Sequence, residues 1–114
     1  MADSPLCGDV WTVVLDRVRG YEQGGRRPAL VVSIDEFNDG PAGLVVVLPL
    51  TTTLRRLPFR VPLEPPEAGV IQPSSIMVEQ PRTVARERFG PRWGAVTGET
   101  MQRVERALRA LLVL

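Results

Sequence analysis

The segment of residues 44–50 constrains the fold more than any other part of the chain. It reads Leu-Val-Val-Val-Leu-Pro-Leu, an almost wholly apolar run that is rich in β-branched residues. Such a run is typical of a strand that is buried on both faces of its sheet. The turn-forming triplet Asp39-Gly40-Pro41 precedes it, and three threonines follow it. We therefore expect residues 44–50 to form the most buried strand of the molecule.

Shorter runs of the same kind flank this segment and are separated by turns that contain glycine or proline. One of them, Phe59–Leu63, is expected at an edge of the sheet because Pro58 and Pro62 cannot donate to a ladder. Residues 17–27 contain three glycines and show no apolar periodicity, so we expect a long loop there. The other predicted strands are Val10–Leu15, Ala29–Ser33, Ser75–Gln80 with its continuation at Arg82–Val84, and Trp93–Val96.

The C-terminal segment has the pattern of an amphipathic helix that begins after Thr97, a suitable N-cap residue. A helical turn is also expected at Asp35–Asn38, and Pro65-Pro66 marks a turn. Together these patterns predict a mainly β fold with some α structure, a small barrel-like sheet with short helices and an amphipathic C-terminal helix. The apolar stripe of that helix consists of Met101, Val104, Leu108 and Leu111.

The length of 114 residues suits one domain, residues 1–114, with a single core. No apolar run approaches the roughly 20 residues that a membrane helix needs. The first residues lack the basic start and apolar stretch of a signal peptide. We therefore expect a cytoplasmic protein that does not enter a membrane.

The inventory of reactive side chains excludes several kinds of site. Cys7 is the only cysteine and there is no histidine, so an intrachain disulfide and a Cys/His zinc site are both excluded. Histidine is also the usual general acid or base near neutral pH. An enzyme built from this chain has to rely on carboxylates, arginines and hydroxyls. We expect neither a metal site nor a cofactor.

The positive charges are unusual in kind and in distribution. All 14 basic residues are arginines, although the net charge is only +1. Residues 51–63 contain three arginines and no acid, and residues 81–92 contain four arginines and one glutamate. A GC-rich genome can explain the lack of lysine, but it does not explain the acid-free stretches. The planar guanidinium fork suits phosphate groups, so these stretches are candidate phosphate-binding segments.

Two strand ends carry the candidate chemistry. At one, Glu22-Gln23-Gly24-Gly25-Arg26-Arg27-Pro28 places a carboxylate and two guanidiniums before a predicted strand. At the other, Thr51 follows the most buried strand. Functional groups are often held at such ends. Each feature alone also has a plain structural explanation, since a pair of arginines is often only solvated and a threonine after a strand often satisfies the backbone of a turn.

Taken in chain order, five motifs give these features a context: Gly8–Trp11, Glu22–Ser33, Val47–Thr51, Pro58–Val61 and Glu79–Thr83. Their order closely resembles that of the MazF/PemK family of toxin–antitoxin mRNA interferases, from about residue 8 to residue 112. The resemblance implies an SH3-like barrel with a C-terminal helix, a homodimer, and sequence-specific cleavage of single-stranded RNA. It also implies inhibition by a cognate MazE-like antitoxin.

The resemblance assigns roles by position. The family's arginine before the proline falls on Arg27, its strand-end threonine on Thr51, and its loop glutamate on Glu22, which together would be catalytic. Arg26 adjoins Arg27, and the resemblance leaves open whether the two share a role. The residues expected to bind RNA are Arg17, Arg19, Gln23, Arg26, Thr52, Arg55, Arg56, Gln80 and Arg82.

This chemistry is feasible without histidine or metal, because RNA carries its own nucleophile, the 2′-hydroxyl, beside the scissile phosphate. In-line attack would leave a 2′,3′-cyclic phosphate and a 5′-hydroxyl. Arg27 would stabilise the charge that develops on the phosphate, and Thr51 would donate a hydrogen bond to a phosphate oxygen. Guanidinium stays protonated, so any general base would be Glu22 with its pKa raised by burial.

Two alternatives belong to other functional classes. One is a non-catalytic toxin of the same fold that poisons DNA gyrase through its C-terminal helix and typically ends in a tip containing tryptophan, whereas this chain ends in Leu111–Leu114. The other is a degenerate SH3-like module that binds RNA or a partner without cutting. The cleavage motif, the class of RNA and the identity of the antitoxin do not follow from the sequence.

Overall fold

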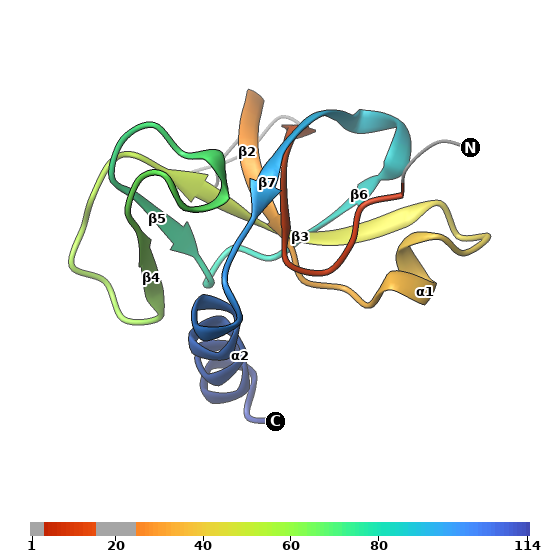
Figure 1. The fold of residues 1–114 in the computed structure, drawn as a ribbon. Helices are drawn as coiled ribbons and strands as arrows, with labels where there is room; N and C mark the ends of the chain where they lie inside the picture. The colour runs from red at the N-terminus through yellow and green to blue at the C-terminus, as the bar shows by residue number, and fades with distance from the viewer. Residues whose placement is uncertain (1–3, 16–24) are drawn as a thin grey trace.

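The computed structural model describes residues 4–15 and 25–114, and within them the chain forms a strongly curved antiparallel sheet with one long helix (Figure 1). The elements in chain order are β1 (Asp9–Leu15), β2 (Gly25–Val31), α1 (Asp35–Asn38), β3 (Leu44–Thr51), β4 (Arg60–Leu63), η1 (Glu67–Gly69), β5 (Ser74–Met77), β6 (Arg82–Ala85), η2 (Arg86–Arg88), β7 (Phe89–Ala95) and α2 (Gly98–Leu112).

The strand order in the sheet is β4-β5-β3-β2-β1-β7, and β6 pairs with β3. In Figure 1, β3 crosses the molecule from the side that carries α1 to the side that carries β4 and β5. The strands β7, β1, β2, β3 and β6 curve into a barrel-like shape. The sheet does not close, because the described chain passes from β6 to β7 through η2 without a ladder between the two strands.

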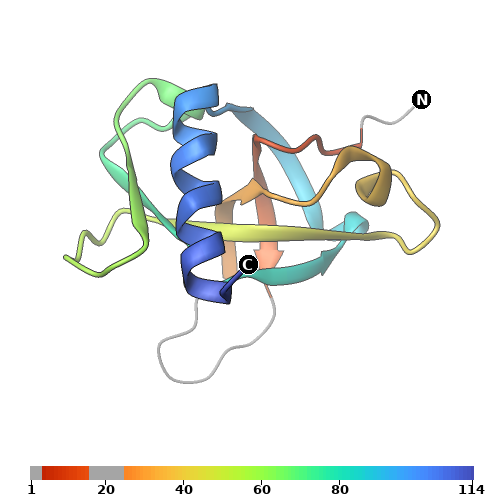
Figure 2. The ribbon, with the colours of Figure 1, turned by 90° about the horizontal axis from the view of Figure 1, so that it is seen from below.

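The length of the chain suggests a single core, but alternate residues of the central strands build two, one on each face of the sheet. On the concave face of the barrel, Ala29, Val31, Val45 and Val47 pack together with Trp11 and Phe89 at the rim. On the other face, Leu30, Leu48 and Leu50 pack with β4, β5 and α2, which lies across this face in Figure 2. β3 contributes to both cores, so the predicted burial of its two faces is confirmed.

Helix α2 begins where the sequence predicts. Thr97 is the N-cap, and its hydroxyl accepts a hydrogen bond from the Thr100 amide at 3.2 Å. Glu67 of η1 adds a second cap, because its carboxylate accepts from the Thr97 amide at 3.0 Å and from the Thr100 hydroxyl at 2.6 Å. Burial tends to raise the pKa of Glu67, but these hydrogen bonds outweigh it and hold the pKa below its ordinary value.

Most of the predicted elements are confirmed, including the helical turn at residues 35–38 and the edge position of β4. Three predictions need correction. Residues 25–27 belong to β2 and not to a loop, because each pairs with a residue of β1. Residues 75–80 and 82–84 are not one continued strand, since a turn follows Met77. β5 pairs with the end of β3, and β6 pairs with its start. The last strand begins at Phe89, because it pairs along β1.

Among the residues that the structure describes, no helix is long and apolar enough to cross a membrane.

An ion pair holds the start of β4 against the turn that follows β5. The Nε of Arg60 donates to both carboxylate oxygens of Glu79, at 3.1 and 2.9 Å, and its Nη2 donates at 2.6 Å. The Arg60 side chain is only 9% exposed. Burial tends to raise the pKa of Glu79, but the hydrogen bonds and charge of Arg60 outweigh it and hold that pKa below its ordinary value of 4.5. Arg60 is therefore a structural residue, although it lies in an acid-free stretch of the sequence.

We predict that Glu79→Gln lowers the free energy of unfolding at pH 7 by about 1–3 kcal/mol, because a charge-assisted pair is lost. A lowered carboxyl pKa stabilises the fold above the ordinary value of 4.5, and this stabilisation is lost as the pH falls through the lowered value. Thermal melts from pH 7 to pH 3 should therefore converge for wild type and variant. The exposed carboxylate of Glu64, changed to Gln, is the control; parallel pH profiles for wild type and Glu79→Gln would contradict the prediction.

Candidate active site

The two strand ends singled out in the sequence lie beside each other in the fold. The register between β2 and β3 pairs Ala29 with Pro49 and Leu30 with Leu48. Arg27 and Thr51 lie two positions beyond the last pair of this ladder, one on each strand. Both residues line a cleft of about 220 Å³. The sheet thus brings together a guanidinium and a hydroxyl that are 24 positions apart in the chain, as their residue numbers show.

The cleft opens at this point because β3 exchanges one neighbour for another. The ladder between β2 and β3 ends at the pair of Ala29 and Pro49, and Pro28 and Pro49 have no N–H to extend it. Beyond Pro49, β3 pairs with β5, where Thr51 lies opposite Ser75. Arg27 in turn is held by β1, where it lies opposite Val13. The two candidate catalytic residues are therefore held by different neighbouring strands, Arg27 by β1 and Thr51 by β5.

Thr51 is only 6% exposed, and its hydroxyl oxygen accepts a hydrogen bond from the Thr53 amide at 3.1 Å. This is the turn contact that an ordinary threonine after a strand would make. A hydroxyl has one hydrogen to donate as well as lone pairs to accept. The bond from Thr53 engages the oxygen as an acceptor and orients the group. The hydroxyl hydrogen is then suited to donation toward an anion in the cleft.

Charge distinguishes this cleft. Arg26 and Arg27 both line it, and none of the described lining residues is acidic. The Arg26 side chain is exposed and extends over β7, where its Nη2 would lie 3.4 Å from a Cβ placed on Gly90. Arg27 is half-buried. Two guanidiniums and a donating hydroxyl in an acid-free hollow form a site that suits a phosphate group.

The opposite wall is formed by β7 and by the segment that follows η1. Trp93, Val70, Ile71 and Gln72 line it. The backbones of η1 and β7 approach closely, because a Cβ on Gly69 would lie 2.5 Å from the carbonyl oxygen of Trp93. Gly69 also has a φ of +79°, a conformation that side chains rarely adopt. This contact sets the position of the whole wall.

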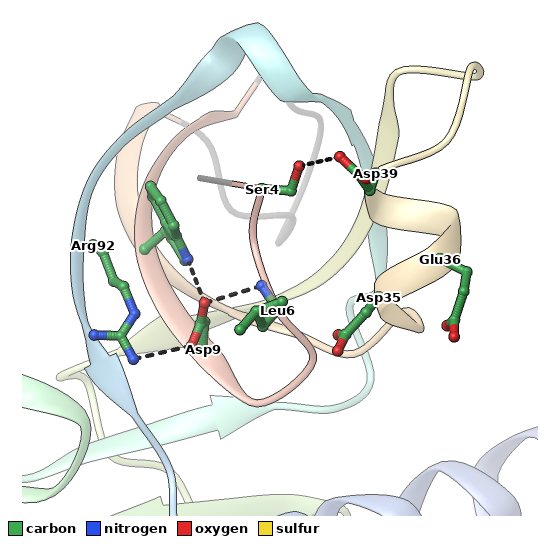
Figure 3. A pocket seen from close by; sticks show the side chains of 8 residues that line it. Ser4, Leu6, Asp9, Asp35, Glu36, Asp39 and Arg92 are labelled. Atoms are coloured by element: carbon green, nitrogen blue, oxygen red, sulfur yellow. Dashed lines mark hydrogen bonds and ion pairs between the residues drawn. The ribbon is translucent and has the colours of Figure 1, made fainter. Parts of the chain in front are cut away.

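A larger cleft of about 610 Å³ lies near the N-terminal segment and has the opposite charge (Figure 3). Most of its carboxylates accept hydrogen bonds from other residues of the chain. Asp9 accepts from the Leu6 amide and from the indole of Trp11, and Arg92 donates to it at 3.1 Å. Asp39 accepts from the hydroxyl of Ser4. An acidic hollow of this kind repels phosphate, so size alone does not make it the functional site.

Cys7 is not a suitable nucleophile. Burial raises the pKa of its thiol, and the nearby carboxylates of Asp35, Glu105 and Asp9 raise it further. The thiolate, which is the reactive form, is therefore scarce at neutral pH.

Comparison with known proteins places this chain in a family. The sequence profile of a family described as PemK-like, MazF-like toxin of type II toxin–antitoxin system matches residues 6–112. The chain belongs to this toxin family. The family expected from the five motifs is thereby confirmed.

Individual relatives of this MazF-like toxin agree in sequence and in fold. The chain is 33% identical over 112 residues to endoribonuclease MazF9 of Mycobacterium tuberculosis, and the match covers 94% of this chain and 95% of the relative. A crystal structure of MazF from Deinococcus radiodurans superposes with a TM-score of 0.87 at 29% identity, covering 99% of this chain and 100% of the other. An endoribonuclease in complex with its cognate antitoxin, from a mycobacterial species, gives a TM-score of 0.74 at 27% identity, covering 99% and 97%.

The structure brings together only part of the site predicted for the toxin. Arg26, Arg27, Thr51 and Thr52 line one cleft, and Arg55 and Arg56 lie on the exposed segment that leaves it. Gln80 and Arg82 are half-buried and do not line this cleft. Glu22, Gln23, Arg17 and Arg19 lie outside the described residues. The sequence reasoning missed the wall of Val70, Ile71, Gln72, Ser74 and Trp93.

We predict that Gly69→Ala destabilises the protein by about 1–3 kcal/mol, since the added Cβ meets backbone atoms that cannot move aside easily. The melting temperature should fall and the tryptophan fluorescence should change. Gly98→Ala is the control, because a Cβ there meets nothing within 4 Å. Equal melting temperatures for Gly69→Ala and wild type would show that the η1–β7 contact does not set this wall.

Proposed function

We propose that this toxin is a sequence-specific, metal-independent endoribonuclease that cuts single-stranded RNA in the cleft between β2 and β3. The endoribonuclease names of the M. tuberculosis relative and of the mycobacterial complex support the activity. The observation that carries the proposal is that Arg27 and Thr51 line one cleft, whose described lining residues include no acid. The gyrase-poisoning and non-cutting alternatives do not account for this pairing.

In the proposed reaction, the 2′-hydroxyl oxygen attacks the adjacent phosphorus and forms a new O–P bond. The P–O5′ bond breaks, which leaves a 2′,3′-cyclic phosphate and a 5′-hydroxyl. Arg27 offsets the negative charge that accumulates on the phosphate oxygens, and Thr51 donates a hydrogen bond to one of them. The half-buried position of Arg27 favours this role, because water screens its charge less than that of an exposed arginine.

The attacking 2′-hydroxyl loses a proton, and the leaving 5′-oxygen gains one. Glu22 remains our proposed base, by position in the family motif, and lies outside the described residues. Arg26, Thr52, Arg55 and Arg56 surround the cleft or lead away from it, where they can contact phosphates on either side of the cut. Dependence on a 2′-hydroxyl restricts the activity to RNA. Gln80 and Arg82 would contact more distant nucleotides.

The proposed partner is a cognate MazE-like antitoxin, and the relative solved with its cognate antitoxin supports this. Apolar residues are exposed beside the arginines, with Leu54 59% and Leu57 41% exposed. An acidic, partly disordered antitoxin segment with apolar anchors suits such a surface. We further propose that the toxin acts as a homodimer in the cytoplasm, where its RNA substrates are found.

We predict that cleavage of a long RNA persists in excess EDTA. The polar side chains that line the cleft among the described residues are arginine, threonine, serine, glutamine and tryptophan, which include no carboxylate to hold Mg²⁺. The products should carry 2′,3′-cyclic phosphate and 5′-hydroxyl ends, as end-labelling and mass spectrometry can establish. Activity that stops in EDTA and returns with Mg²⁺ would rule out the proposed chemistry.

A second prediction separates the two adjacent arginines. Arg27→Ala and Thr51→Ala should each slow single-turnover cleavage, and removal of one such donor typically costs about 10²–10³ in kcat. Arg26→Ala should mainly weaken RNA affinity and reduce its salt dependence, because Arg26 is exposed. Melting temperatures serve as the control for folding. Arg26→Ala abolishing the chemical step, with Arg27→Ala within about threefold of wild type, would move the catalytic role to Arg26.

A further inference from the structure

Trp93 is the aromatic side chain among the described residues that line the cleft, and the proposed reaction does not use it. It belongs to β7, lines the same hollow as Arg27 and Thr51, and is 37% exposed. Its indole Nε1 donates to the hydroxyl of Thr12 in β1 at 2.8 Å. This hydrogen bond fixes the orientation of the ring. A large aromatic surface is therefore exposed beside a phosphate-binding group.

The backbone under this ring is held firmly. Gly69 approaches the carbonyl of Trp93, and a Cβ on the next residue, Gly94, would lie 3.0 Å from the backbone of Ala68. Both contacts leave no room for side chains between η1 and β7. The indole is thus fixed by its backbone on one side and by Thr12 at its tip. A preorganised ring of this kind loses little conformational entropy when a flat group stacks on it.

The surroundings of Trp93 indicate what kind of group that is. Arg26 and Arg27 lie on the same cleft, and Ile71, 87% exposed, lines the wall beside the ring. An exposed aromatic ring next to guanidiniums is the combination by which proteins bind single-stranded nucleic acid, with bases on the ring and phosphates on the cations. A peptide segment would use the apolar wall but would leave the two arginines without phosphate partners.

We propose that Trp93 is a base-stacking platform, on which the base of a nucleotide next to the scissile phosphate lies while Arg27 and Thr51 hold that phosphate. This inference rests on the proposed endoribonuclease function and names the residue that selects for an unpaired base. Trp93 is a positioning and specificity residue in this scheme. A stacked base restricts the movement of the neighbouring sugar. The 2′-hydroxyl of that sugar is then held in line with the scissile phosphorus.

The test uses a short RNA that the wild-type toxin cuts once, together with the same RNA carrying a 2′-deoxy nucleotide at the cut so that it binds without cleavage. Trp93→Leu removes the aromatic face, and Trp93→Phe retains one. Phe37→Leu is the matched control, because Phe37 is 38% exposed and does not line the cleft. Affinity is measured by fluorescence anisotropy, and an abasic nucleotide is placed in turn at each position of the RNA.

Trp93→Leu should weaken binding of the uncleavable RNA about tenfold or more, Trp93→Phe should weaken it less, and Phe37→Leu should leave it unchanged. At one position beside the cut, an abasic nucleotide should weaken wild-type binding by a similar factor and leave Trp93→Leu unaffected. The abasic scan with wild type and Trp93→Phe decides the question even if Trp93→Leu does not fold.

Three results would overturn the platform. Binding by Trp93→Leu within twofold of wild type, with an unchanged cut site, would show that no base stacks on this ring. In a second contradictory outcome, each abasic nucleotide weakens binding by the same factor in Trp93→Leu as in wild type. The two losses would then be independent, and the ring would only support the fold. Wild-type toxin that cuts no RNA at all would overturn the proposed function itself, a result distinct from the first two.

Discussion

The exchange of partners along β3 is the constraint on which the rest of the structure depends. Over its first part β3 pairs with β2 and β6, and after Pro49 it pairs with β5. A strand bonded to three neighbours has to be apolar on both faces, because it crosses two cores. The end of the ladder with β2 also creates the cleft. The same run of residues that stabilises the fold therefore determines where the site opens.

Two clefts on the surface of this toxin carry opposite charge. In the acidic cleft, carboxylates make hydrogen bonds within the chain, which they accept from Ser4, Leu6 and Trp11. The arginine-lined one has a buried hydroxyl on one wall and an exposed tryptophan on the other. The net charge of +1 conceals this division. For a polyanionic substrate, local charge decides the binding site, and the larger hollow is not selected.

The sequence predicts most of the fold because the patterns involved are local. The apolar run of β3, the prolines of β4 and the Thr97 cap each act within a few residues. The start of β2 was mistaken for a loop because Gly25 and two arginines favour a loop by themselves, whereas pairing with β1 holds them in a strand. The pairing of Arg60 with Glu79 was missed for a related reason, since the two residues are brought together only by the β4–β5 ladder.

Part of the candidate site is likewise predictable from local sequence and part is not. Arg27 and Thr51 are predicted by position in the family motifs, and both line one cleft in the structure, while their catalytic roles stay a prediction. The wall that contains Trp93 was not predicted, because it depends on a backbone contact between η1 and β7 that leaves no periodic signal in the sequence. In the sequence, only Gly69 and Gly94 mark this contact. A glycine that lets two backbones pack closely cannot be told from a glycine in a turn by sequence alone.

The short turn η1 connects two parts of the molecule that have different tasks. Glu67 caps helix α2, and two residues later Gly69 lies against Trp93. A replacement in this turn would disturb the helix and the cleft at once, so little variation is tolerable there. Ile71 and Gln72 follow after Val70, line the cleft and are exposed. Where RNA lies in this cleft, as we propose, altered side chains at these two positions would change the contacts to the RNA and leave the scaffold beneath them the same.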